Sequence, residues 1–203
     1  MWKRSECQRR KTEYGRKCPG QIEMAVSMFS IFMITTVMVV GLKIAQFMIT
    51  GAYVEDALAA SNLASALIDV EEFGKSRVIR IEDPVAAYAW YKEALSQNLM
   101  LDEEGRSFQQ ELLEGSIQVK SYIIYNVEGD QVEIVSFAEG GEDPKISIQA
   151  IGEVYTPDGV LVETTTIYSR VTFQVKGIGQ MCIQAEKEKS VDIKRAENDE
   201  QNG

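Results

Sequence analysis

An uncharged apolar run near the N-terminus is the feature that most constrains this chain. The run extends from Met24 to Leu42 and holds 19 residues without Asp, Glu, Lys or Arg. As an α-helix it would be about 28 Å long, close to the ~30 Å thickness of a bilayer's hydrocarbon core. A helix in the core of a soluble protein rarely stays apolar around its whole circumference for this length. We therefore predict a single transmembrane helix at residues 21–43, with the lipid bilayer as a partner.

Charge is distributed unevenly on the two sides of this run. Residues 1–20 carry seven basic and two acidic side chains, a net charge of +5, whereas the whole chain carries −10. Basic flanks of a membrane span stay in the cytoplasm. We therefore predict a basic cytoplasmic leader at 1–20 and an extracytoplasmic location for the acidic remainder. A cleaved signal peptide is the alternative, but its apolar region is usually shorter and ends at a small-residue cleavage motif.

Helical periodicity continues after the apolar run. Residues 44–73 contain no proline, and their apolar and small residues recur at three- and four-residue steps. This spacing is typical of an amphipathic helix. We predict one helix from about residue 22 to residue 73 and an extended helical stalk at 44–75. The candidate subunit-contact residues on this stripe are Val54, Ala57, Leu58 and Ser61; the alternative is that the stripe packs against the chain's own outer domain.

The rest of the chain predicts a small α+β domain at residues 76–185, outside the membrane. Asp83 and Pro84 are a suitable N-cap and first-turn residue for a second helix at 84–99. From Ser116 onward the apolar period changes to two, which predicts antiparallel strands.

Two further predictions concern the end of this domain. The Thr156–Gly159 segment predicts a hairpin whose arms are 145–156 and 159–176. A last short strand is expected at 181–185, followed by a charged, flexible tail at 186–203.

The residue types argue against common enzyme chemistry. The chain contains no histidine, which removes histidine-based triads, histidine general bases and His-ligated zinc. Its three cysteines form no disulfide framework, and Cys182 is expected to be a small core residue. The acidic clusters lack calcium-loop spacing. We therefore expect a non-enzymatic protein without metal or cofactor, and the acidic balance argues against nucleic acid as a partner.

The eight residues from Arg16 to Glu23 carry the most specific local signal. They place a basic side chain, Lys17, before Gly20 and Glu23, directly ahead of the apolar run. Together with the long N-terminal helix and the β-rich outer domain, this arrangement resembles the type IV pilin-like proteins, especially the TadE/TadF-type pseudopilins of tight-adherence (Tad) pili and secretion systems. The resemblance covers the architecture throughout and a recognisable motif over residues 16–45.

The resemblance implies that a prepilin peptidase cuts between Gly20 and Gln21, with Lys17 supplying leader charge. It also implies that Glu23 meets the freed amine of a neighbouring subunit. In the family the glutamate usually lies five residues after the processed glycine, whereas Glu23 lies three after Gly20. The partners it implies are sister pilin-like subunits and secretion machinery, and the role is that of a minor assembly subunit. The alternative is a membrane-anchored extracytoplasmic binding or sensor domain, in which Gly20 and Glu23 have no special role.

Overall fold

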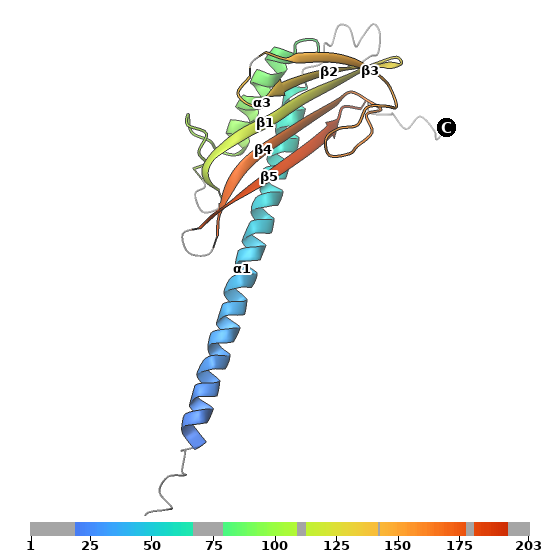
Figure 1. Ribbon diagram of the computed structural model, residues 1–203. Helices are drawn as coiled ribbons and strands as arrows, with labels where there is room; N and C mark the ends of the chain where they lie inside the picture. Colours follow the sequence, from blue (N-terminus) through green and yellow to red (C-terminus); the bar gives the residue numbers. More distant parts are fainter. Residues whose placement is uncertain (1–18, 67–78, 109–112, 142, 178–180, 195–203) are drawn as a thin grey trace, which may run out of the picture. The chain divides into compact units, whose positions relative to one another are not determined.

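The computed structural model describes residues 19–66, 79–108, 113–141, 143–177 and 181–194 (Figure 1). The chain divides into two compact units, Met1–Ala45 and Gln46–Gly203. Helix α1 covers Pro19–Ser65, which confirms a long apolar N-terminal helix. Ala66 is already outside α1, and residues 67–73 of the predicted helix lie outside the described residues.

The second unit contains one small antiparallel sheet of five strands, in the order β3-β2-β1-β4-β5. The fold is therefore α+β, as predicted. The strands are β1 (Glu114–Glu128), β2 (Gln131–Ala138), β3 (Lys145–Ala150), β4 (Thr166–Lys176) and β5 (Cys182–Asp192).

Helix α3 (Pro84–Asn98) agrees with the predicted second helix. The Asp83 carboxylate accepts a hydrogen bond of 2.9 Å from the backbone N–H of Ala86, which satisfies one of the free donors at the helix start. On the inner face of α3, Tyr88 stacks on the Tyr122 ring of the sheet, and Tyr91 packs against the same ring at a tilt. The closest pair is Tyr88 and Phe137, whose ring centroids are 4.5 Å apart. These tyrosines anchor packing, and α3 is fixed over β1 and β2.

The predicted hairpin at 156–159 is only partly correct. The turn exists, because the N–H of Gly159 donates to the carbonyl of Thr156 over 2.8 Å. Its predicted arms pair only beside the turn, where Tyr155 and Leu161 form an antiparallel bridge, because β3 pairs with β2 and β4 pairs with β1 and β5. The segment between β3 and β4 instead packs Val154 and Val162 against the face of the sheet opposite the helices. The hairpin is therefore short, and burial of apolar side chains, not the turn, selects the partners of β3 and β4.

The C-terminal strand is longer than predicted. β5 extends to Asp192, so the short strand at 181–185 and the flexible tail from 186 are both corrected. The physical reason is an alternation of Glu and Lys at residues 186–189, which places acidic side chains on one face of β5 and basic side chains on the other. Residues 195–203 of the predicted tail lie outside the described residues.

Candidate functional site

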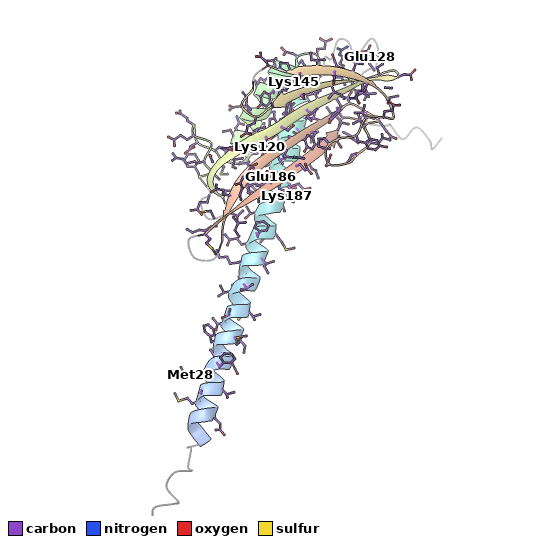
Figure 2. All side chains as sticks on the ribbon, in the orientation of Figure 1. Met28, Lys120, Glu128, Lys145, Glu186 and Lys187 are labelled. Carbon is purple, nitrogen blue, oxygen red and sulfur yellow. The ribbon has the colours of Figure 1, made fainter. Side chains whose placement is uncertain are left out.

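The apolar half of α1 exposes its side chains on all sides. Every described side chain from Glu23 to Leu42 is exposed, and Figure 2 shows Met28 pointing away from the helix. The hydroxyl groups of this segment each donate to the carbonyl oxygen four residues earlier, over 2.8–2.9 Å; they belong to Ser27, Ser30, Thr35 and Thr36. The polar groups are thus satisfied within the helix, as a hydrocarbon environment requires. Among the described residues, this helix is long and apolar enough to span a bilayer, which is compatible with a membrane anchor.

The predicted processing residues lie at or before the start of α1. Lys17 falls outside the described residues, whereas Gly20 and Gln21 belong to the first turns of the helix. The side chain of Glu23 is exposed, and its backbone carbonyl accepts the hydroxyl of Ser27. Leader cleavage and a subunit contact at Glu23 stay predictions.

The four other candidate subunit-contact residues have a different role. Val54, Ala57, Leu58 and Ser61 are all buried in the core of their own sheet domain. The hydroxyl of Ser61 donates to the carbonyl of Ala57 over 2.7 Å and accepts from the Asn98 amide over 3.1 Å. This corrects their assignment as a subunit surface, because the apolar stripe is already covered by β-sheet and α3. The alternative of packing within the chain is confirmed.

A charged clamp joins α1 to the edge strand β5. The Glu55 carboxylate lies 3.2 Å from the Lys187 ammonium and 2.9 Å from the Lys189 ammonium. The hydrogen bond from Lys189, followed by that from Lys187, lowers the pKa of Glu55 below its usual value. Because the folded state lowers this pKa, the stabilisation is present at neutral pH and is lost as the carboxylate is protonated in acid. All three groups are about one-third exposed, so each pair contributes less than about 1 kcal/mol.

Buried polar side chains fix the end of α1 more firmly. The Asn62 amide donates to the backbone carbonyl of Lys189 over 3.0 Å. The hydroxyl of Tyr122, on β1, donates to the Ser65 hydroxyl over 2.8 Å. These bonds link α1 to an edge strand and to the central strand of the sheet. Sequence reasoning missed them because the partners are separated by 127 and 57 residues.

The face of the sheet opposite the helices carries a charged cluster. The Arg170 guanidinium lies 2.6 Å from the Glu188 carboxylate, which also accepts from the hydroxyl of Tyr168 over 2.5 Å. Desolvation, followed by the hydrogen bond to Glu188, raises the pKa of the Tyr168 hydroxyl. Arg170 and Glu188 line a shallow hollow with Glu186 and Lys187; Figure 2 labels the last two on β5. The cluster offers both signs of charge to a polar ligand.

The acidic loop after α3 forms a local turn. The Asp102 carboxylate accepts from the backbone N–H groups of Glu104 and Arg106 and from the Arg106 side chain, over 2.8–3.0 Å. These bonds lower the pKa of Asp102, with the backbone bond from Arg106 as the largest cause. Within the described residues, no group of three Cys, Asp or Glu side chains is placed to hold a metal ion.

Cys182 is exposed at the start of β5, which corrects the expectation of a core residue. Its sulfur lies 3.3 Å from the Glu114 carboxylate, to which the thiol donates. This hydrogen bond is the largest cause of a raised pKa at Cys182, because ionisation would place a thiolate beside a carboxylate.

Replacing Glu114 by glutamine should lower the pKa of Cys182 and speed its alkylation at neutral pH, since the thiolate is the reactive form. The measurement is the pH profile of the maleimide reaction rate in a Cys7→Ser, Cys18→Ser background. The midpoint should move to lower pH in the Glu114→Gln variant. Replacing Glu139, which is paired with Lys120, is the control and should leave the midpoint in place. An unchanged midpoint in Glu114→Gln would contradict the assignment.

The two halves of α1 therefore offer different surfaces. Residues 24–42 present exposed, uncharged side chains, whereas residues from Thr50 to Ser65 supply a buried face to the sheet domain. This arrangement is suited to anchoring and assembly, and the charged hollow is suited to binding a polar group. Comparison with protein-family models, curated proteins and solved structures gives no match to the chain.

Proposed function

We propose that this chain is a non-enzymatic, single-pass membrane protein that acts as a minor pilin-like or pseudopilin-like assembly subunit. One observation carries the proposal: α1 extends without a break from Pro19 to Ser65. Residues 24–42 of this helix are exposed and uncharged, and its C-terminal part contributes to the domain core. The anchor and the folded domain thus share one helix, as expected where lateral packing of helices must position the domain.

The direction of the span follows from charge. The basic side chains of residues 1–20 favour a cytoplasmic N-terminus by the positive-inside rule, so the sheet domain would lie on the extracytoplasmic side. In the proposed assembly, the segment from Met24 to Leu42 is embedded beside the corresponding helices of sister subunits. Glu23 directly precedes this segment, and its carboxylate would be costly at membrane depth between sister helices unless it met a cation. The amine of Gln21, freed by a prepilin peptidase, would supply that cation.

A membrane-anchored extracytoplasmic binding or sensor domain is the second candidate. The observation that favours it is the hollow lined by Arg170, Glu186 and Glu188 on the face of the sheet opposite the helices. In that case α1 would serve only as an anchor and stalk, and Glu23 would have no partner protein. The two candidates therefore differ in what removal of the Glu23 charge should do.

Glu23→Ala should reduce recovery of the chain in crosslinked assemblies several-fold, while the sheet domain stays folded. Glu23→Asp retains the carboxylate and is the matched control, so it should assemble nearly as well as the wild type. The measurement is crosslinking in intact cells, followed by membrane extraction and gel analysis of the assembled fraction. The intact mass of the extracted chain shows in the same samples whether it begins at Gln21.

Equal assembly of Glu23→Ala, Glu23→Asp and wild type would count against an assembly subunit and favour the binding domain. A chain that retains Met1 in the assembled fraction would refute leader processing. A chain that begins well past Leu42 would refute the membrane anchor itself, because the span would have been removed.

A further inference from the structure

We propose that the sheet domain makes a second membrane contact of its own, in which Met181 and Ile183 at the start of β5 touch the lipid surface. The inference rests on the proposed function, since it requires residues 24–42 to span a bilayer. It concerns one end of the sheet domain, which would lie against the lipid surface.

The contacts between α1 and β5 show which end this is. Lys187 lies against Gly51 and pairs with Glu55, whereas Lys189, two residues later, pairs with Glu55 and bonds to Asn62. The two elements therefore run in the same sense. The start of β5 therefore lies toward the N-terminal end of the helical segment 46–65, which belongs to the same unit.

The lengths of the two elements place the start of β5 at the extremity of the domain. From Lys187 back to Ile183, four strand residues cover about 13 Å. From Gly51 back to Gln46, five helix residues cover about 7.5 Å. Ile183, and Met181 before it, are therefore near the same end of the unit as Gln46, its first residue.

Large apolar side chains are exposed at this end on both elements. Met181 and Ile183 are 66% and 49% exposed, and on α1 Met48 and Ile49 are 69% and 61% exposed. Single exposed apolar residues are common on soluble proteins, but a group at one end indicates a contact surface. The uncharged run ends at Leu42, four residues before Gln46. Its closeness indicates that the surface contacted is lipid.

The connection to that run holds this end close to lipid. Gln46 follows Leu42 by four residues, which span at most about 14 Å even when fully extended. The polar headgroup layer is about 5–8 Å thick on each side of the hydrocarbon core. Met181 and Ile183 are thus kept within reach of the headgroup boundary, where apolar side chains gain by leaving water.

The charges at this end have both signs. Lys176 is exposed opposite Cys182 in the β4–β5 ladder and can meet anionic headgroups. The Glu114 carboxylate is at the same end and accepts a hydrogen bond from the Cys182 thiol. The contact is therefore expected to depend on apolar side chains more than on lipid charge.

The exposed thiol between the two residues provides the test. An environment-sensitive fluorophore is attached to Cys182 in a chain that carries Cys7→Ser and Cys18→Ser. The labelled chain is reconstituted in phosphatidylcholine–phosphatidylglycerol vesicles. Some of the lipids carry a nitroxide near the headgroup end of the acyl chain. We expect a blue shift of the emission and a marked loss of fluorescence. The control label at Ile148→Cys, with Cys182→Ser, is also exposed, on the edge strand β3, and should show neither effect.

The outcomes separate this inference from the function on which it rests. Equal quenching of the two labels in protein that floats with the vesicles would overturn the lipid contact and leave the anchor intact. If the Cys182 label loses the same fluorescence in vesicles without nitroxide lipid, the loss comes from contact between copies of the protein. That result would also overturn the lipid contact. Protein that fails to float would overturn the proposed anchor. Replacing Met181 and Ile183 together by serine should weaken the quenching without changing flotation.

Discussion

Replacing Leu58 by alanine should lower the free energy of unfolding of the sheet domain by about 2–5 kcal/mol. Leu58 is fully buried where α1 packs against the sheet and α3. Its truncation removes apolar contacts and leaves a cavity that rigid strands and a long helix cannot easily close. The measurement is urea unfolding of the full chain in detergent micelles, followed by near-ultraviolet circular dichroism of the packed tyrosines.

Leu63→Ala is the matched control for this variant. Leu63 lies on the same helix, five residues later, but is 58% exposed. Its replacement should change the free energy of unfolding by less than about 0.5 kcal/mol. Because the same residue type is replaced by the same residue, intrinsic helix propensity contributes equally to both variants. Equal destabilisation in the two variants would contradict the core position of Leu58 and restore it as a candidate subunit contact.

The sequence predicted α1, α3 and the first two strands because each has a strong period or a clear end signal. The uncharged run predicts a helix from its own composition, without knowledge of what packs against it. Asp83 and Pro84 mark the start of α3 because they act on the neighbouring backbone. β1 and β2 are joined by a tight turn in which Gly129 has a φ of 59°, which glycine adopts without strain.

Periodicity identifies a buried face but not what covers it. The stripe that contains Val54 and Leu58 is equally suited to a second subunit and to the chain's own sheet. The choice depends on distant contacts that form only when the chain folds, such as those of Ser61 with Asn98, 37 positions away, and of Asn62 with Lys189, 127 positions away. The same limit applies to β3 and β4, whose partners are chosen by packing on both faces of the sheet and not by the turn at 156–159.

Charge alternation was the missed signal for β5. A strand is usually recognised by alternating apolar residues, but here Glu188 faces Arg170 and Lys187 faces Glu55. Both faces are polar, so composition predicted a solvated tail. The misplacement of Cys182 has a related cause, because its apolar neighbours in the sequence lie at an exposed end of the strand.

Two arginines at the centre of the uncharged run should abolish stable membrane insertion. Met33→Arg with Val37→Arg places two cations one helical turn apart, on side chains that are exposed in α1. Each arginine at mid-bilayer costs about 2.5–3.5 kcal/mol, so the pair should shift the insertion equilibrium by at least about a thousandfold. Arginine is a good helix former, so α1 itself should persist. The measurement is the fraction of chain that resists carbonate extraction from membranes.

The same pair of arginines placed further along α1 tests whether position or charge is responsible. Met48→Arg with Ala52→Arg has the same spacing, and both side chains are exposed. Residue 48 follows Leu42 by six positions, so these arginines can extend their charged groups into water and should leave carbonate resistance nearly unchanged. If both double variants stay in the membrane to the same extent, the run from Met24 to Leu42 does not span the bilayer. The assembly role and the lipid contact at β5 would then fail together, because both depend on that span.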